Sequence, residues 1–571
     1  MPIQNAEIAA MFDEAADLLD IKGDNPFRSR AYHRAARVLA QWPENVGTLL
    51  QQGKDLDDLP GIGEDLAGKI AAIVATGKFD LLESLKRELP GELPKIAALP
   101  GLGPKRVKRL HEELGIETIE DLRRSVKSGR LKSLRGFGPK FEEKIGAALA
   151  KPSAPARFKI PFAEAEAQAL VAFLKKRLAR GQIEIAGSLR RRRDTIGDVD
   201  IVACAENSAA LGERLRAYDN VAEVLAQGPT RTSVVLRSGI QIDLRVVSEE
   251  SFGAALLYFT GSKAHNIALR SLANEHGWKL NEYGLFAGAR RIAGASEAEI
   301  YKKLGLATIP PELREDRGEI ALAKTNSLPK LVTSSDLRGD LHVHSDWSDG
   351  TAPIGEMAAA ARARGYRYIA LTDHSQRVTI AHGLDGQRLA RQIATVDKLN
   401  DETPDFTILK GMEVDILANG RLDLSDHMLA RLDIVVAAVH SKFDLPRAEQ
   451  TERIIKAMDN PHVSIIAHPT GRLIGEREAY PLDLEKLILA AQERGCALEI
   501  NAHPDRLDLN DIGAHAAKEA GVLLAISTDS HSVAGLDNIR FGIDQARRGW
   551  LTADDVLNTR PLAQLKKLLK R

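Results

Sequence analysis

The sequence predicts a multidomain protein with an all-α N-terminal part, an α+β middle part and a C-terminal α/β barrel. Helix-like segments separated by short Gly/Pro turns fill residues 1 to about 150. A charged middle segment contains a strand-like run with two aspartates, and short apolar runs that each end in His or an acidic residue recur after residue 337. At 571 residues the chain is long enough for several domains, each with its own core.

The overall charge is balanced, with 79 Lys+Arg against 79 Asp+Glu, but it is unevenly distributed. Residues 151–330 carry an excess of bases, which suits a phosphate backbone, and residues 331–571 carry an excess of acids, which suits cations. Cys204 and Cys496 fall in apolar runs of different predicted domains, so no structural disulfide is expected. We see no signal peptide and no apolar run long enough for a bilayer, and we therefore expect a cytoplasmic protein without a membrane partner.

Three turns in the N-terminal part repeat one pattern: LPGIGEDLAGKI (59–70), LPGLGPKRVKRL (99–110) and LRGFGPKFEEKI (134–145). Glycine lets the backbone approach a ligand closely, and the N–H groups at the start of the following helix can bind phosphate. A single Gly-x-Gly usually marks only a turn, but three copies with matching flanks predict helix-hairpin-helix motifs that bind the DNA backbone. The expected DNA-binding residues are Gly61, Gly63, Gly101, Gly103, Lys105, Gly136, Gly138 and Lys140.

The middle part contains QIEIAGSLRRRRDTIGDVDIVACA (182–205), which predicts a strand behind a Gly187-Ser188 turn. Asp198 and Asp200 would share a face of this strand, where two carboxylates repel each other unless a cation lies between them. The segment TSVVLRSGIQIDLRVV predicts a hairpin that brings up Asp243 as a third carboxylate. Three unrelated surface aspartates are the alternative, but this does not explain a same-face pair behind a Gly-Ser turn.

These motifs, together with LLYFTGSKAHNIALR and LNEYGLF, resemble the family X DNA polymerases over about residues 1–320. FRSRAYHRAARVLAQWP and the first hairpin segment are similar to the N-terminal domain of that family. The resemblance implies a polymerase beta-like core in which Asp198, Asp200 and Asp243 bind two Mg²⁺ or Mn²⁺ ions. It implies nucleotide binding by Gly187, Ser188, Arg191, Tyr258, Phe259, Gly261, Ser262 and Asn266, and a template contact by Arg270. Lys263 departs from the acidic residue of the best-known family member.

Lys69 falls where this family has a Schiff-base lysine, and Tyr32 and Arg28 match neighbouring positions. Asp65 replaces a family lysine close by, and an acidic neighbour would raise the pKa of the Lys69 amine. We therefore expect at most weak 5′-deoxyribose-phosphate lyase activity. A lysine that only contacts phosphate is an equal alternative.

The C-terminal part contains the runs YIALTDH, TILKGME, IVVAAVH, SIIAHP and LLAISTDSH, separated by helix-like stretches. Such runs predict parallel strands of an α/β barrel, whose C-terminal ends converge on one face. A lone histidine is usually an ordinary packed residue that binds no metal. That alternative does not explain why several strand ends each carry a histidine or a carboxylate. Imidazole and carboxylate together favour zinc, manganese or iron.

HVHSDWSDG, LTDHS, GMEVDI, AAVHS, IAHP and STDSH resemble the PHP (polymerase and histidinol phosphatase) domain over residues 337–571. The resemblance implies a distorted barrel of seven strands, for which seven strand-like runs lie between Asp340 and His531. It also implies a phosphoesterase centre with up to three divalent ions (Zn²⁺, Mn²⁺ or Fe²⁺). The implied ligands are His342, His344, Asp349, His374, Glu413, His440, His468, Asp529 and His531.

The whole chain resembles the bacterial family X polymerases that carry a PHP domain. We expect helical DNA-binding (1–85), helix-hairpin-helix (86–152), nucleotidyltransferase palm (153–250), thumb (251–317), linker (318–336) and PHP (337–571) segments. The expected protein is a monomeric, nucleoid-associated polymerase that fills short gaps in base excision-type repair, using gapped or primed DNA and deoxynucleoside triphosphates. The PHP domain would add a 3′–5′ exonuclease or 3′-phosphodiesterase. The alternatives are a template-independent nucleotidyltransferase with a silent, structural PHP domain, and a PHP phosphatase for a small metabolite.

Overall fold

The computed structural model of the chain forms two compact units, Met1–Ala156 and Arg157–Arg571. Within the chain, the described residues are 5–570 except 42–45, 52, 58, 60–61, 90–91, 98, 100–101, 135–136, 139–140, 143–144, 147–148, 150–156, 177–180 and 206–207. None of the helices in these ranges is both long and apolar enough to span a membrane.

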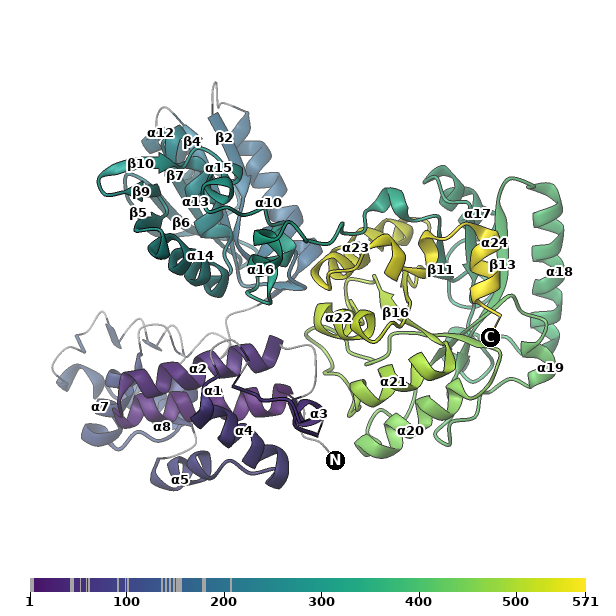
Figure 1. The fold of residues 1–571 in the computed structure, drawn as a ribbon, viewed down its shortest axis with the longest axis horizontal. Helices are drawn as coiled ribbons and strands as arrows, with labels where there is room; N and C mark the ends of the chain where they lie inside the picture. The colour runs from purple at the N-terminus through teal and green to yellow at the C-terminus, as the bar shows by residue number, and fades with distance from the viewer. Residues whose placement is uncertain are drawn as a thin grey trace. The chain divides into compact units, whose positions relative to one another are not determined.

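The first unit is helical, as expected, and is coloured purple to dark blue in Figure 1. Its helices pack around two separate apolar clusters. Phe12, Tyr32 and Phe79 pack their rings together in the first cluster, with centroids 5.1–5.8 Å apart. Phe137 is buried in the second cluster. The described helices are α1 (Asn5–Lys22), α2 (Pro26–Gln41), α3 (Val46–Gln51), α4 (Glu64–Thr76), α5 (Asp80–Glu88), α6 (Leu93–Ala97), α7 (Pro104–Leu114) and α8 (Ile119–Lys127), with a short 3₁₀ turn at Leu131–Ser133.

The second unit begins with a five-stranded sheet in the order β2-β4-β7-β6-β5. The strands are β2 (Gly181–Ile185), β4 (Asp198–Ala205), β5 (Val221–Gln227), β6 (Arg231–Leu236) and β7 (Gln241–Val247). β4 and β7 run parallel, and the other neighbouring pairs are antiparallel. A separate two-stranded pair joins β1 (Phe158–Lys159) to β3 (Thr195–Ile196). Helices α10 (Ile160–Lys175), α11 (Gly187–Arg190) and α12 (Ser208–Arg216) accompany the sheet. The antiparallel β6–β7 pair confirms the expected hairpin, which turns at Gly239 with a φ of +88°.

The next part contains α13 (Phe252–Thr260), α14 (Lys263–Glu275), α15 (Glu297–Lys303) and a small sheet of β8 (Trp278–Asn281), β9 (Gly284–Ala287) and β10 (Arg290–Ala293). The segment 318–336, expected as a linker, is not a simple spacer. It contains α16 (Glu319–Lys324). Its Ala323 and Leu331 pack into the apolar core that α13 and α14 form through Leu257 and Leu269. Its Glu319 is fully buried against His265, with Oε1 2.6 Å from Nδ1, which explains why the segment folds back.

The C-terminal part confirms the expected barrel, with seven parallel strands in sequence order. They are β11 (Gly339–Val343), β12 (Tyr368–Leu371), β13 (Thr407–Asp415), β14 (Ile434–Ala438), β15 (Val463–Ile466), β16 (Ala497–Asn501) and β17 (Leu524–Ser527). A bridge between Val343 and Ser530 links the two end strands. The covering helices are α17 (Ile354–Ala363), α18 (Gly386–Glu402), α19 (Asp426–Leu429), α20 (Arg447–Met458), α21 (Leu484–Arg494), α22 (Asp511–Glu519), α23 (Ile539–Arg548) and α24 (Leu562–Leu568).

Candidate functional site

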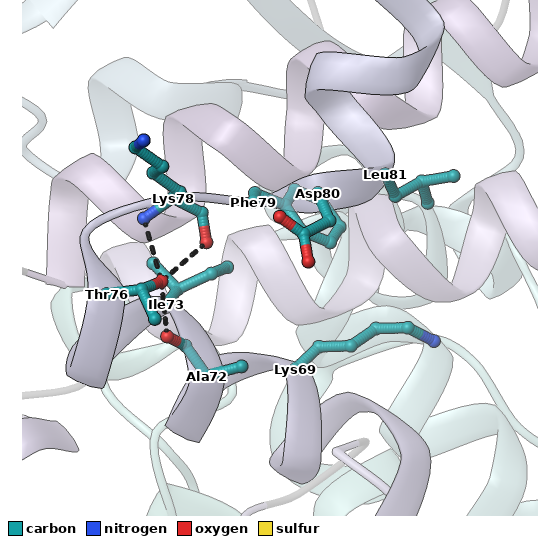
Figure 2. Close-up of a pocket in the computed structure, with 8 residues that line it drawn as sticks. All are labelled: Lys69, Ala72, Ile73, Thr76, Lys78, Phe79, Asp80 and Leu81. Atoms are coloured by element: carbon teal, nitrogen blue, oxygen red, sulfur yellow. Dashed lines mark hydrogen bonds between the residues drawn. The ribbon is translucent and has the colours of Figure 1, made fainter.

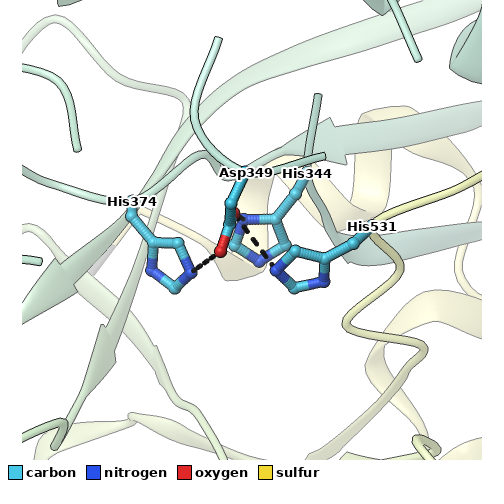
Figure 3. Close-up of side chains that lie close together, drawn as sticks. All are labelled: His344, Asp349, His374 and His531. Carbon is cyan, nitrogen blue, oxygen red and sulfur yellow. Dashed lines mark ion pairs between the residues drawn. The ribbon is translucent and has the colours of Figure 1, made fainter. Parts of the chain in front are cut away.

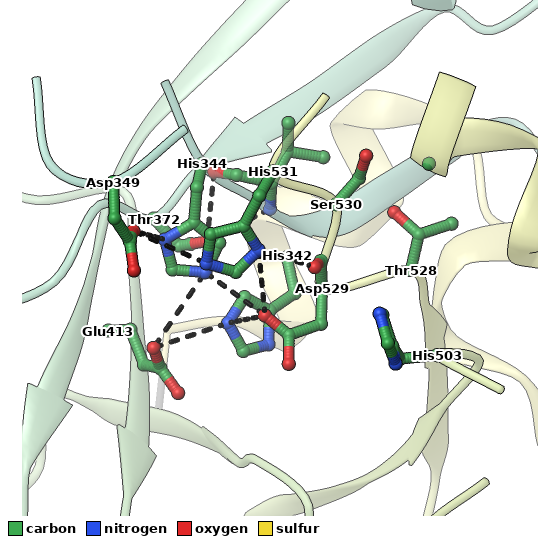
Figure 4. Close-up of polar contacts among 12 residues, drawn as sticks. His342, His344, Asp349, Thr372, Glu413, His503, Thr528, Asp529, Ser530 and His531 are labelled. Carbon is green, nitrogen blue, oxygen red and sulfur yellow. Dashed lines mark hydrogen bonds and ion pairs between the residues drawn. The ribbon is translucent and has the colours of Figure 1, made fainter. Parts of the chain in front are cut away.

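The C-terminal ends of the barrel strands bring together the metal-ligating side chains expected from the sequence. β11 supplies His342 and is followed by His344, while Glu413 lies in the second half of β13. The remaining members follow β11, β12, β14, β15 or β17 directly or in the next loop; they are Asp349, His374, His440, His468, Asp529 and His531. Figure 4 shows His342, His344, Glu413 and Asp529 pointing toward one another. The parallel arrangement therefore brings residues that are almost 190 positions apart in the sequence into one cluster.

Three groups of these residues each have ligand atoms within 4.8 Å of one another. The first, shown in Figure 3, contains His344, Asp349, His374 and His531. The other two are His342, His344 and Asp529, and His374, Glu413 and His440. His468 completes the cluster, since its Nε2 lies 3.0 Å from Glu413 Oε1. Because His344 and His374 each belong to two groups, the groups form one continuous centre.

Several polar atoms of this centre are buried without a hydrogen-bond partner among the described residues. They include His342 Nε2, both ring nitrogens of His344, and Glu413 Oε2. Leaving such atoms unsatisfied inside a protein is costly, so buried polar groups normally have partners. Divalent cations would satisfy them, and the mixture of imidazole and carboxylate is the donor set that zinc, manganese and iron accept. The residues present therefore fit a metal centre.

The pKa shifts in the cluster are mixed. Burial alone would lower the pKa values of His342, His374, His440 and His531, but neighbouring carboxylates outweigh it and raise them, to about 10 for His374.

Other groups of the cluster are held in the forms that bind metals. Burial, reinforced by His531 and His374, lowers the pKa of His344 to about 3, so its ring is neutral. Burial alone would raise the pKa of Glu413, but the surrounding histidines outweigh it and hold this pKa well below the ordinary value. Hydrogen bonds from His374 and His531 likewise outweigh burial and lower the pKa of Asp349. Neutral imidazole and ionised carboxylate are the forms that bind metals.

Two buried acidic residues that were not among the expected ligands lie next to them in the structure or the sequence. Buried Glu499 accepts a hydrogen bond from the backbone N–H of His468 at 2.7 Å and lies 2.8 Å from His342 Nδ1, which leaves His342 Nε2 for a metal. Buried Asp373 accepts hydrogen bonds from the hydroxyls of Ser345 and Ser348. A glutamate inside the otherwise apolar run ALEIN was a visible signal for Glu499.

The second set of carboxylates lies on the five-stranded sheet. Asp198 and Asp200 alternate along β4, and Asp200 pairs with Asp243 of the parallel strand β7. Burial raises the pKa of Asp200 to about 7, with further contributions from Asp198 and Asp243, and burial followed by Asp243 raises the pKa of Asp198. Asp243 is held in place by Gln241 Nε2 at 2.6 Å and by the Ser233 hydroxyl. Such mutual repulsion is relieved when a divalent cation binds between the carboxylates.

The predicted nucleotide-binding loop lies directly beside this strand. Gly187 has a φ of +65°, and any Cβ there would collide with the Asp200 carboxylate, so this position requires glycine. Ser188 follows in the short helix α11. Arg191 is largely buried, with its Nε 3.1 Å from Glu315 Oε1 and its Nη1 donating to the Thr260 carbonyl.

The YFTGS segment meets the same loop. A Cβ on Gly261 would lie 3.2 Å from Arg191 Nη1, so the two predicted nucleotide-binding segments touch. Tyr258 packs edge-on against Phe259, with ring centroids 5.2 Å apart, and its carbonyl accepts a hydrogen bond from Asn266 Nδ2 at 2.6 Å. Arg270 and Asn266 line a small pocket with Tyr258. Ser262 caps α14, in which Lys263 is the first residue.

The described glycines of the helix-hairpin-helix turns have open space where a side chain would lie. Gly63 and Gly103 are the N-caps of α4 and α7, with φ values of −97° and −87° that any residue can adopt. A Cβ at Gly63, Gly103 or Gly138 would meet no atom of a described residue within 4 Å. The described fold therefore does not require glycine there, whereas close approach of a phosphate backbone does. Gly61, Gly101, Gly136, Lys140 and the side chain of Lys105 lie outside the described residues.

Lys69 lies on α4 and lines a pocket of about 560 Å³ together with Thr76, Lys78 and Phe79 (Figure 2). Its ammonium is bonded to Asp65 and lies 5.5 Å from the centre of the Tyr32 ring. Burial works against the charged amine, but Asp65 and Tyr32 outweigh it and raise the pKa of Lys69, as the sequence led us to expect. Arg28 is paired with Asp24 at 3.0 Å.

Comparisons with family models agree with this architecture. Residues 3–79 match a helix-hairpin-helix domain, and residues 53–115 and 93–151 match a SAM-like helix-hairpin-helix tandem. Residues 255–315 match the DNA polymerase beta thumb, and residues 340–503 match the PHP domain. Polymerase and PHP domains imply dependence on divalent metals, and helix-hairpin-helix domains in a polymerase imply a DNA substrate.

Individual relatives cover either the whole chain or only its barrel. A protein of Bacillus subtilis (strain 168) named DNA polymerase/3′-5′ exonuclease PolX is 40% identical over 570 residues, which are 99% of each chain. A protein named probable phosphatase from Thermoanaerobacter sp. (strain X514) is 32% identical over 243 residues, which are 40% of this chain and 94% of its own. The full-length match, the thumb and the PHP domain together show that the chain belongs to the family X DNA polymerases that carry a C-terminal PHP domain.

Proposed function

We propose that the protein is a DNA-directed DNA polymerase that fills short gaps during base excision-type repair and trims 3′ ends with its PHP domain. The observation that carries this proposal is the presence of two separate sets of candidate metal ligands in one chain that also contains open helix-hairpin-helix turns. The relative that matches along the whole chain is named for both activities.

For synthesis, Asp198, Asp200 and Asp243 would hold two Mg²⁺ or Mn²⁺ ions. Such ions neutralise the triphosphate charge and acidify the primer 3′-hydroxyl when bound. Gly187, Ser188 and Arg191 would bind the phosphates of a deoxynucleoside triphosphate through N–H, hydroxyl and guanidinium groups. The Tyr258–Phe259 ring pair would lie under the sugar and leave no room for a 2′-hydroxyl, with Gly261, Ser262, Asn266 and Arg270 completing the nucleotide and template contacts.

For hydrolysis, the strand-end cluster would hold up to three Zn²⁺, Mn²⁺ or Fe²⁺ ions. Such ions acidify water and neutralise a phosphodiester when bound. Asp349 and His531 are the most exposed members, with 34% and 35% of their side chains accessible, so the 3′ end would enter from their side. Glu499 and Asp373 would keep the ligands oriented.

The remaining assignments follow from this function. The six segments expected from the sequence would be the working modules, and the protein would act as a monomer at the nucleoid, where its DNA substrate lies. Lys69 is already bonded to Asp65, so lyase activity at this site would be weak.

Phosphatase activity on small molecules is a second candidate for the barrel, because the barrel-length relatives are named probable phosphatases. Release of phosphate from nucleoside monophosphates, compared with trimming of a DNA 3′ end, separates the two. Preference for the DNA end supports the proposed exonuclease.

The proposal is tested with a gapped duplex carrying a 5′-labelled primer. With all four triphosphates the primer should lengthen to the end of the gap, and without them it should shorten when Mn²⁺ is present. Extension of a primer that has no template would support the template-independent alternative. A primer that never shortens would support a silent, structural PHP domain.

A further inference from the structure

The loop after β16 places neighbouring side chains in two different parts of the second unit. Arg506 faces the strand-end cluster, where its Nε lies 3.5 Å from Asp529 Oδ2. The next residue, Leu507, is fully buried in the apolar core of the five-stranded sheet, together with Ile160 and Leu189. One loop therefore joins the candidate nuclease centre to the polymerase palm.

Arg506 is placed to bind an anion beside the metal cluster. Asp529 turns Oδ1 toward His342 and His344, at 3.6 and 3.2 Å, while its Oδ2 contacts Arg506 and Asn501. The guanidinium thus lies behind the metal-facing oxygen, at the rim of the centre, with 20% of the side chain exposed. Within the described ranges, no hydrogen bond or ion pair involves its two Nη atoms.

A second guanidinium, that of Arg477, lies close enough to Arg506 for the two charges to interact. Arg477 donates to the Gly471 carbonyl at 2.8 Å and stacks on the Phe443 ring, 4.0 Å from its centroid. No carboxylate pairs with Arg477 among the residues that the structure describes. Two guanidinium groups at the rim of a site for cations favour the binding of a further anion, and a phosphodiester is the anion that reaches such a centre.

The palm holds this loop through ionic contacts as well as through Leu507. Arg472 donates from Nε to the Arg506 carbonyl at 2.8 Å and from Nη2 to the Leu507 carbonyl at 2.5 Å. Its Nη1 is paired with Asp194, the palm residue just before β3, at 3.1 Å. On the adjoining strand β1, Lys159 is bonded to Asp505 at 2.6 Å. Contacts from β1 and from the residue just before β3 therefore fix the position of the loop.

We propose that Arg506, assisted by Arg477, binds the phosphodiester at the nuclease centre, and that the polymerase palm positions Arg506 through Asp194 and Arg472. The proposal rests on the hydrolytic function proposed for the barrel and adds its phosphate-binding side chain. It makes the palm a part of the nuclease site, although none of the palm residues that the structure describes touches a metal ligand.

The test compares Arg506→Gln, Arg506→Lys, Asp194→Asn and the wild-type protein, all full length and loaded with Mn²⁺. Arg540→Gln is the matched control, because Arg540 forms another ion pair with the palm, at Glu164, without touching the loop. Hydrolysis of bis(4-nitrophenyl) phosphate reports the active site without the DNA-binding domains. Inorganic phosphate binding, measured by calorimetry, and bound metal are the readouts that do not depend on turnover.

Loss of a charge-assisted hydrogen bond should raise KM for the diester and Kd for phosphate about tenfold in Arg506→Gln, with kcat and bound metal little changed. Arg506→Lys should recover part of this loss, and Asp194→Asn should raise both constants about threefold, more than Arg540→Gln does. Gap filling by each variant checks that the protein is folded.

Three results would overturn the proposal. Unchanged phosphate binding in Arg506→Gln would remove its anion-binding role, and loss of metal with a fall in kcat would show that Arg506 only supports Asp529. Equal effects of Asp194→Asn and Arg540→Gln would remove the role of the palm. If the wild-type protein binds phosphate through Arg506 but does not cleave the diester, the hydrolytic function fails while the anion site stands.

Discussion

The two candidate metal sites differ in how completely the protein encloses them. In the barrel, His342, His344 and Glu413 are fully buried, and several of their polar atoms have no partner in the described structure. On the palm sheet, Asp198 is exposed and only Asp243 is buried, where Gln241 and Ser233 already bond to it. We therefore expect ions to stay bound in the first site and to arrive with a nucleotide in the second.

This difference follows from the chemistry of the ligands. Six imidazoles and three carboxylates supply enough donors to satisfy several ions without a substrate. Three aspartates offer fewer donors, so we expect phosphate oxygens to complete the palm site. The comparison therefore predicts that each activity can be removed without the other.

The largest effect is expected from removing the palm carboxylates. Asp198→Ala combined with Asp200→Ala should lower gap filling by about 10³-fold or more, because no ion can then stabilise the developing charge. Primer shortening should persist near the wild-type rate, as should both activities in the surface control Asp219→Ala. Nucleotide incorporation by the double variant would show that the palm carboxylates are not the polymerase centre.

Acid should affect the two sites in different ways. Protonation of the histidines expels metal from the barrel, so hydrolysis should fall below about pH 6.5. Free aspartate stays ionised at this pH, so the palm site would not respond to acid if its ligands had ordinary pKa values. However, burial and the neighbouring carboxylates raise the pKa of Asp200 to about 7. Since its proton must leave before Mg²⁺ binds, the half-saturating Mg²⁺ concentration for synthesis should rise up to about tenfold per pH unit below 7. A constant Mg²⁺ requirement between pH 8 and pH 6 would contradict this.

The helix-hairpin-helix turns should contribute equally to synthesis and to hydrolysis. DNA must bind to the protein before it can react at either site, and these turns are expected to bind its backbone. Gly103→Ala fits the described part of the fold, since a Cβ there meets no described atom within 4 Å, but its methyl group would crowd a phosphate. Affinity for gapped DNA should fall severalfold for all sequences, and the slope of log affinity against log salt should lose about one unit per lost contact. Gly68→Ala, an equally open glycine inside α4, is the control. Sequence-selective weakening would indicate base contacts instead.

The smallest effect concerns Lys69, which belongs to neither metal site. Asp65→Asn removes the carboxylate that raises the pKa of the Lys69 amine, so more neutral amine is available to attack an abasic sugar. Borohydride trapping of the Schiff base should increase a few-fold. An unchanged yield would support the interpretation of Lys69 as a phosphate contact.

Much of each metal site could be predicted from the sequence because its geometry depends on local periodicity. Alternation along β4 places Asp198 and Asp200 together, and parallel strands bring their C-terminal ends to one face. Contacts between distant elements left no such pattern. Glu315 beside Arg191, Glu319 beside His265, and the Asp194–Arg472 pair each join segments whose proximity depends on the tertiary fold.

The segment 318–336 is another region whose contacts could not be predicted from local sequence patterns. Its small and polar residues are typical of a linker, yet Ala323 and Leu331 pack into the thumb core. The apolar residues that decide this are too widely spaced to give a helical or strand pattern, so only the folded partner surface reveals their role.

Metal content measured together with both activities tests the central claim of two independent centres most directly. His342→Ala combined with His344→Ala should be purified without chelators, next to the wild-type protein and the Asp198/Asp200 double alanine variant. We expect the histidine variant to lose tightly bound metal and primer shortening but to keep gap filling. The aspartate variant should keep its bound metal and lose only gap filling. Full exonuclease activity in a histidine variant that has lost its metal would contradict the account.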